Sequence, residues 1–121
     1  MNILVIDDDK MTSQALTHSL EELGHKPFVA NDGEHAITKI TNGEYDLVIS
    51  DVMMPGISGL SLLNVLRTVH LCFTPVIMMS SLHNSPLIEA SLRAGASDFI
   101  SKPVTIEELA AKLSKYDKTN Q

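Results

Sequence analysis

Five short apolar runs, distributed along the whole chain, limit its possible folds more than any other feature. They are residues 3–6, 27–30, 47–49, 76–79 and 99–100, and successive runs begin 20 to 29 residues apart. Most runs are continuous rather than alternating, which is typical of parallel strands covered by helices on both faces. The spacing leaves room for one helix and two short loops between neighbouring strands. The pattern therefore predicts an α/β fold: a doubly wound, five-stranded parallel sheet with helices on both faces.

The segments between the runs carry the start and stop signals of helices. Gly24 follows a leucine-rich helical stripe and predicts the end of the first helix. Ser85 and Pro86 predict an N-cap followed by proline at the first helical position, and Gly95 predicts the end of that helix. Thr105 and Glu108 have the spacing of a capping box and predict the start of the last helix.

Composition narrows the class of protein. A chain of 121 residues is long enough for one domain with a real core, and it shows no internal linker or repeat. Fifteen acidic against nine basic residues give a net charge of -6, which argues against a nucleic-acid-binding domain. The single Cys72 cannot form an internal disulfide, which favours a reducing cytoplasm. The apolar runs are too short to span a membrane, and the acidic N-terminal segment does not resemble a signal peptide.

Polar residues follow four of the five predicted strands. In open parallel sheets, ligand sites form beyond the carboxyl ends of the strands, so these residues are expected at one edge of the sheet. Carboxylates, hydroxyls and an ammonium group would meet there. The residues are Asp7, Asp8 and Asp9 after the first strand, Ser50 and Asp51 after the third, Ser80 and Ser81 after the fourth, and Ser101, Lys102 and Pro103 after the fifth.

The aspartates have two interpretations. An acidic run after a strand is commonly a helix N-cap or a solvated surface, and Asp9 fits that description. Asp51, however, ends a neighbouring central strand, and crowded carboxylates raise one another's pKa. Mg²⁺ prefers such hard oxygen ligands and commonly takes one or two carboxylates, waters and a phosphate oxygen. We favour metal binding over capping for Asp7 and Asp8.

Lys102 and Ser80 also have a structural and a functional interpretation. Lys102 is either a surface lysine before a turn or a compact positive charge for a carboxylate or phosphoryl oxygen. Ser80 either satisfies a backbone group at a strand end or donates a hydrogen bond to a phosphoryl group. Their position beyond neighbouring strands favours the functional interpretation.

With these residues in place, the chain resembles the receiver domains of two-component response regulators. The resemblance covers essentially all of residues 1–121 as one receiver domain, and its motifs are residues 3–9, 46–56, 75–81 and 95–103. Four motifs in the same order at compatible spacing make the resemblance specific. It implies a flavodoxin-like sheet with strand order 2-1-3-4-5.

The resemblance implies a phosphorylation-activated signalling switch rather than a conventional enzyme. Asp51 would accept a phosphoryl group from a phosphohistidine of a histidine kinase or histidine phosphotransfer protein. Lys102 and Ser80 would contact the phosphoryl oxygens, and the domain would catalyse only its own phosphorylation and slow autodephosphorylation. Mg²⁺ would be held by Asp7, Asp8, Asp51 and the backbone carbonyl of Met53.

The same resemblance implies how the switch works. The Lys102–Pro103 peptide bond would be cis. Ser80 and Phe99 would be the switch residues, although threonine and tyrosine are more usual there. A downstream protein would bind the face formed by the fourth helix, fifth strand and fifth helix, near His83 and Leu87. The domain would be a monomer or a phosphorylation-dependent dimer, and would itself bind neither nucleic acid nor membrane.

Three alternatives are weaker. Asp7 and Asp9 are spaced like the acid pair of haloacid-dehalogenase-type phosphohydrolases, but Thr12 lies one place from the position that motif requires, and the chain is too short for the usual cap and core. A docking module that never takes phosphate would not need the complete set of acids, hydroxyl and lysine. A flavin mononucleotide binder would carry hydroxyls and glycine after its first strand, where this chain is acidic.

Overall fold

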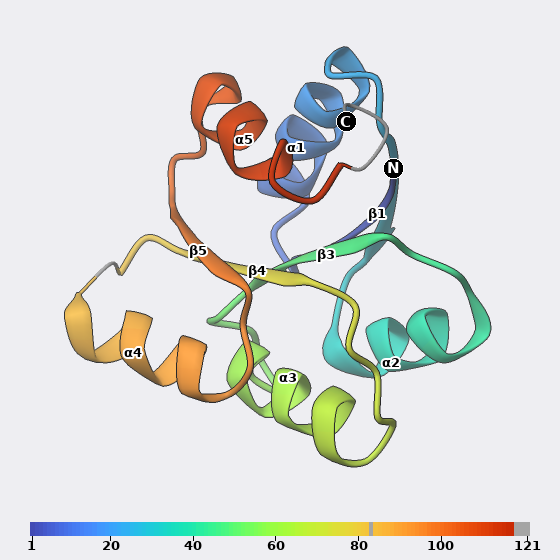
Figure 1. Cartoon of the computed structure of the whole chain (residues 1–121), viewed down its shortest axis with the longest axis vertical. Helices are drawn as coiled ribbons and strands as arrows, with labels where there is room; N and C mark the ends of the chain where they lie inside the picture. Colours follow the sequence, from blue (N-terminus) through green and yellow to red (C-terminus); the bar gives the residue numbers. More distant parts are fainter. Residues whose placement is uncertain (83, 118–121) are drawn as a thin grey trace.

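A five-stranded parallel sheet forms the centre of the computed structural model, which describes residues 1–82 and 84–117. Its strand order is β2-β1-β3-β4-β5, which confirms the predicted flavodoxin-like topology (Figure 1). The strands are β1 (Asn2–Ile6), β2 (Lys26–Ala30), β3 (Leu47–Asp51), β4 (Val76–Ser80) and β5 (Asp98–Ser101). The helices are α1 (Lys10–Glu22), α2 (Gly33–Asn42), α3 (Gly59–Thr68), α4 (Ser85–Arg93) and α5 (Ile106–Leu113).

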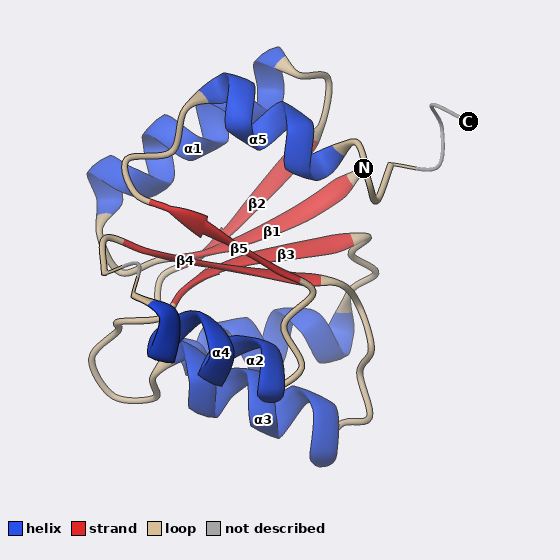
Figure 2. Ribbon diagram, turned by 60° about the vertical axis from the view of Figure 1, so that its left-hand side comes forward, coloured by secondary structure: helices blue, strands red, loops and turns tan. Residues whose placement is uncertain are grey.

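The helices cover both faces of the sheet in two layers. Helices α1 and α5 lie on one face, and α2, α3 and α4 lie on the other (Figure 2). Successive strand residues point to opposite faces, so Ile3 and Val5 pack beneath α1 and α5 while Leu4 and Ile6 pack into the opposite core. Two covered faces explain why the strands read as continuous apolar runs. None of the helices in the described ranges is long and apolar enough to cross a membrane.

The structure adjusts several predicted boundaries. Asp51, Ser80 and Ser101 are the last residues of their strands rather than the residues that follow them. The N-cap of α4 was predicted one residue too late. Asn84, not Ser85, accepts the capping hydrogen bond, from the backbone N–H of Leu87 at 2.9 Å. Pro86 is therefore the second helical residue instead of the first.

Other predicted helix ends are confirmed. The hydroxyl oxygen of Thr105 caps α5 by accepting a hydrogen bond from the backbone N–H of Glu108 at 3.2 Å. Gly24 and Gly95 follow α1 and α4 with φ angles of +87° and +107°. Glycine adopts this left-handed conformation without the penalty that a Cβ atom brings, so both residues end their helices cleanly.

Arg67 binds both of the connections that precede β4 and β5. Its guanidinium donates hydrogen bonds to the carbonyl oxygens of Cys72 and Thr74, both at 2.8 Å, and to that of Gly95 at 2.9 Å. Burial lowers the pKa of this arginine from its ordinary value. Its contacts are with backbone carbonyls, so Arg67 holds the α3–β4 and α4–β5 connections together.

Asp98, at the start of β5, is the centre of a second polar cluster. It accepts hydrogen bonds from Lys112 at 2.9 Å, from Lys115 at 3.4 Å and from the backbone N–H of Phe99 at 2.8 Å. Burial by itself would raise the pKa of Asp98, but these donors outweigh it and hold the pKa below its usual value. The carboxylate therefore ties α5 to the edge strand of the sheet.

The lowered pKa of Asp98 predicts a specific acid sensitivity. A carboxyl whose pKa is lower in the folded than in the unfolded protein stabilises the fold above its unfolded pKa, and this contribution is lost as pH falls through the folded pKa. We expect Asp98→Asn to lower the free energy of unfolding by about 1 kcal/mol at neutral pH, with the difference from wild type shrinking as pH falls below the ordinary pKa of an aspartate. Urea unfolding of both proteins across this pH range measures the difference. A difference that persists undiminished in acid would contradict the assignment.

Candidate functional site

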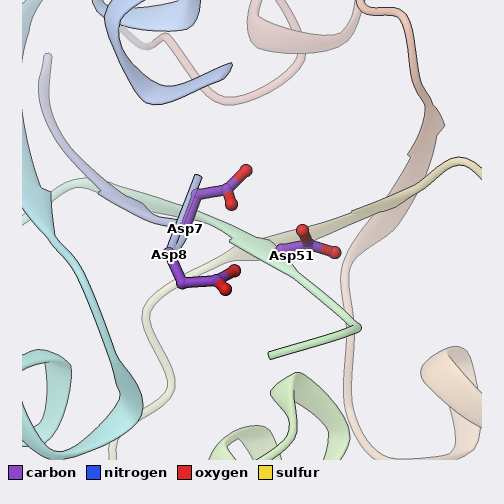
Figure 3. Close-up of side chains that lie close together, drawn as sticks. All are labelled: Asp7, Asp8 and Asp51. Atoms are coloured by element: carbon purple, nitrogen blue, oxygen red, sulfur yellow. The ribbon is translucent and has the colours of Figure 1, made fainter. Parts of the chain in front are cut away.

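Three carboxylates converge at the carboxyl edge of the two central strands. Asp7 and Asp8 follow β1, and Asp51 ends the adjacent β3, whose Ser50 is paired with Ile6. One oxygen from each carboxylate lies within 4.8 Å of the others, and the side chains project into a common region (Figure 3). Asp7 is fully buried and Asp51 is 6% exposed, whereas Asp8 is open to solvent. The structure thus brings together the carboxylates that the sequence placed at one edge.

Lys102 reaches this cluster from the end of β5. Its Nζ donates a hydrogen bond to Asp51 Oδ2 at 2.7 Å and another to Asp7 Oδ2 at 3.1 Å. Its backbone N–H bonds the carbonyl oxygen of Ser80 at 2.9 Å, which fixes the direction from which the long side chain enters. The Lys102–Pro103 peptide bond is cis, as the resemblance implied. The lysine is therefore held inside the acidic pocket.

Burial and neighbouring charges shift the pKa values of this cluster. Burial raises the pKa of Asp7, and the nearby Asp51 charge adds to the rise, while the Asp9 backbone N–H and Lys102 oppose it. Burial alone would lower the pKa of Lys102, but its bonds to Asp51 and Asp7 outweigh this effect and raise the pKa. Lys102 consequently stays protonated at neutral pH. When all three carboxylates are ionised, three negative charges and one positive charge leave an excess of two.

The carboxylates fit a divalent cation. Asp7 Oδ1 accepts a hydrogen bond from the Asp9 backbone N–H at 2.9 Å, and Asp51 Oδ1 accepts one from the Met53 backbone N–H at 3.0 Å. A carboxylate oxygen has more than one acceptor position, so these bonds orient the groups without using up their capacity. Ligands of one Mg²⁺ ion lie at most about 4.2 Å apart, so small rotations or one bridging water suffice here. The excess charge of two also matches a divalent ion.

Asp9 has a structural role, as one of its two interpretations predicted. It is the N-cap of α1, accepting hydrogen bonds from the Met11 backbone N–H at 3.1 Å and from the Thr12 hydroxyl at 2.8 Å. Both bonds lower the pKa of Asp9. Of the three consecutive aspartates, Asp7 and Asp8 therefore belong to the pocket, and Asp9 caps α1.

The predicted switch residues lie beside the pocket and within the core. Ser80, at the end of β4, is 1% exposed, and its hydroxyl oxygen accepts a hydrogen bond from the Leu82 backbone N–H at 3.0 Å. Phe99 is 8% exposed and packs in the core cluster that Leu87 and other α4 residues border. His83, which the sequence placed near the output face, lies outside the described residues.

Gly59 is a site residue that sequence reasoning missed. It is the first residue of α3, and a Cβ atom added there would collide with the carbonyl oxygen of Asp51 and approach Val52 Cα to 2.9 Å. The helix can therefore approach the end of β3 only at a residue without a side chain. A glycine just after a turn residue in the sequence reads as an ordinary helix start, so no local signal marked this contact.

A groove of about 510 Å³ opens next to Lys102, between α1 and the segment after β5. Its walls are largely apolar and include Met11, Ala15 and Val104. Lys102 lines this groove and also bonds the carboxylate of Asp51 in the acidic pocket. The groove therefore adjoins the charged site.

Comparisons with known proteins agree with the geometry. Residues 3–114 match the family model described as the response regulator receiver domain. The chain is 36% identical to the transcriptional regulatory protein TcrA of Mycobacterium tuberculosis over 113 residues, 93% of this chain and 44% of TcrA. More generally, the chain spans about half the length of the curated transcriptional regulators that it matches.

Two solved structures are close in fold. The receiver domain of the Francisella response regulator 1452 is 36% identical, with a TM-score of 0.90 and coverage of 99% of this chain and 98% of that one. The response regulator TrrA of Thermotoga maritima, solved in complex with Mg²⁺-BeF, is 32% identical, with a TM-score of 0.85 and coverage of 96% and 98%.

Proposed function

The chain belongs to the response regulator receiver domain family, and on that premise we propose that residues 1–121 form one phosphorylation-activated receiver domain with Asp51 as its phosphoacceptor. The observation that carries this proposal is the buried contact of Lys102 with both Asp51 and Asp7. An ammonium group held against Asp51 is placed to contact a phosphoryl oxygen there, and a divalent cation would offset the excess negative charge of the carboxylates.

The proposed reaction transfers a phosphoryl group to the carboxylate of Asp51. An Asp51 oxygen forms a bond to phosphorus while the bond from phosphorus to the donor's histidine nitrogen breaks, and the imidazole leaves. Lys102 and the Ser80 hydroxyl bind phosphoryl oxygens. The ligands of Mg²⁺ would be Asp7, Asp8, Asp51 and the Met53 carbonyl oxygen. The bound ion would neutralise negative charge on the phosphoryl group during transfer. The TrrA structure in complex with Mg²⁺-BeF supports this assignment. Hydrolysis of the acyl phosphate by water resets the domain slowly.

The switch begins at Ser80. Its hydroxyl oxygen accepts a bond from Leu82 and still has its proton to donate to a phosphoryl oxygen. The added charge of about -1.5 to -2 would draw this hydroxyl inward and favour the buried rotamer of Phe99. Because Phe99 is already buried in this structure, phosphorylation would stabilise an arrangement that exists beforehand. The output face would be formed by α4, β5 and α5, with the domain a monomer or a phosphorylation-dependent dimer.

The proposed partners are proteins rather than nucleic acid or membrane. A histidine kinase or histidine phosphotransfer protein supplies the phosphoryl group, and a downstream protein reads the output face. The net charge of -6 would repel the phosphate backbone of nucleic acid. We place the exchange in the cytoplasm, where the single Cys72 stays reduced.

Intact-mass measurement after incubation with Mg²⁺ and acetyl phosphate tests the proposal. We expect one phosphoryl adduct on the wild-type protein, no adduct without Mg²⁺, and none on Asp51→Asn. Asp46→Asn is the matched control, because Asp46 is an exposed aspartate whose carboxylate bonds the Asn2 backbone N–H away from the pocket. This variant should accept the phosphoryl group like wild type.

Three results would overturn the proposal. An adduct that persists in Asp51→Asn would place the phosphoacceptor elsewhere. Sustained turnover of a phosphate monoester would instead identify a phosphohydrolase. The absence of any adduct with acetyl phosphate and with a phosphohistidine donor would remove the phosphoacceptor role altogether.

A further inference from the structure

The methionines of this chain differ sharply in their exposure. Met11 and Met53 are 80% and 59% exposed, whereas Met54 is 8% exposed and both Met78 and Met79 are fully buried. A thioether is oxidised by dissolved peroxide at a rate that depends on access to the sulfur. Among the methionines, Met11 and Met53 are therefore the ones that a small oxidant reaches first.

Met53 is the exposed methionine that is directly linked to the phosphoacceptor. It lies two residues after Asp51, and its backbone N–H donates a hydrogen bond to Asp51 Oδ1 at 3.0 Å. The next methionine, Met54, turns into the core, so the chain at this point presents one apolar side chain to solvent and buries the other. The solvent-facing methionine is thus the nearest oxidisable group along the chain to Asp51. Met11 instead follows the N-cap of α1 and lines the groove beside Lys102.

We propose that Met53 is a peroxide-sensitive modification site whose oxidation shortens the lifetime of the Asp51 aspartyl phosphate. This inference rests on the proposed function of Asp51. Oxidation of Met53 would then control the phosphorylation state of Asp51 in addition to the phosphohistidine donor.

The chemistry requires only hydrogen peroxide as oxidant. The Met53 sulfur attacks one peroxide oxygen, a sulfur–oxygen bond forms, the oxygen–oxygen bond breaks, and the second oxygen leaves as water after proton transfer. The sulfur is oxidised by two electrons and the peroxide is reduced by two. Methionine sulfoxide reductases reverse this step, so the modification can serve as a signal.

Oxidation changes what surrounds the acyl phosphate. The thioether side chain is apolar and binds water poorly, whereas the sulfoxide is polar and its oxygen accepts hydrogen bonds from water. Because the Met53 backbone contacts the Asp51 carboxylate, water bound by the sulfoxide would lie near the acyl phosphate that water hydrolyses. The modified domain should therefore lose its phosphoryl group faster, without any change at the catalytic side chains.

The test compares wild-type protein with Met53→Leu, Met11→Leu and Met54→Leu, each before and after hydrogen peroxide. Peptide mass mapping should find oxygen added at Met11 and Met53 before Met54, Met78 or Met79. Each protein is then phosphorylated with acetyl phosphate, separated from the donor, and followed by intact mass as the adduct decays. We expect peroxide to shorten the adduct half-life by about threefold or more in wild type, Met11→Leu and Met54→Leu.

In Met53→Leu, whatever its own half-life, peroxide should leave that half-life unchanged. The inference is overturned if full oxidation of Met53 leaves the wild-type half-life unaltered, or if Met53→Leu responds as wild type does. It is also overturned if Met54 oxidises before Met53. Failure of the proposed function looks different, because untreated wild-type protein would then form no adduct at all.

Discussion

Lys102→Ala should lower the free energy of unfolding by about 3 kcal/mol at neutral pH in the absence of Mg²⁺. The substitution removes the ammonium that bonds Asp51 at 2.7 Å and Asp7 at 3.1 Å. Two almost fully buried carboxylates then repel each other without compensation. If Lys102 binds phosphoryl oxygens as proposed, its loss should also slow adduct formation by about a hundredfold or more.

The loss of stability in Lys102→Ala should depend on pH and on Mg²⁺. The pKa of Asp7 is already raised by burial, and removing Lys102 raises it further. A carboxyl with a raised folded pKa favours the fold in acid and loses that contribution as pH rises through this pKa, so the deficit should shrink at acidic pH. Mg²⁺ replaces the missing positive charge, so the ion should stabilise the variant more than it stabilises wild type.

Urea unfolding at neutral and acidic pH, with and without Mg²⁺, measures these effects. Lys112→Ala is the matched control, since Lys112 pairs with Asp98 rather than with the pocket. Its loss should leave both the response to Mg²⁺ and the rate of adduct formation near those of wild type. Equal stabilisation of wild type and Lys102→Ala by Mg²⁺ would show that the lysine and the ion do not share a site.

Gly59→Ala should destabilise the domain by about 3 kcal/mol and impair phosphorylation at the same time. The new Cβ would collide with the Asp51 carbonyl oxygen, approach Met78 Cε to 2.8 Å, and approach Val52 Cα to 2.9 Å. The Asp51 and Val52 atoms belong to the backbone and cannot rotate away. Alanine normally favours a helix over glycine by about 1 kcal/mol, so the predicted loss has the opposite sign to helix propensity.

The measurements for Gly59→Ala are urea unfolding and adduct formation with acetyl phosphate. Asn64→Ala is the control, because Asn64 is exposed on the same helix and its side chain has no such collision. It should change the free energy of unfolding by no more than about 0.5 kcal/mol. If Gly59→Ala is as stable and as reactive as wild type, the close approach of α3 to Asp51 is not a constraint on the site.

Much of the site could be predicted because parallel strands carry their final residues to one edge. Asp7, Asp51 and Lys102 each follow or end an apolar run, and a run is visible in the sequence as a local pattern. The same rule placed Ser80 at this edge. The sequence also favoured a cap for Asp9 and the pocket for Asp8, and the structure agrees with both placements.

The amino-acid sequence by itself determined the fold class, the order of elements and the edge at which the charged residues gather. These three features follow from the periodic pattern of apolar residues and from the polar residues that directly follow each apolar run. The tertiary structure alone decided that Lys102 bridges Asp7 and Asp51, that Arg67 binds the carbonyl oxygen of Gly95 in the distant loop before β5, and that Gly59 lies against Asp51. Each of these contacts depends on how separate helices, strands and loops pack together. How far a side chain reaches, and how closely two elements approach, produce no periodic pattern in the sequence.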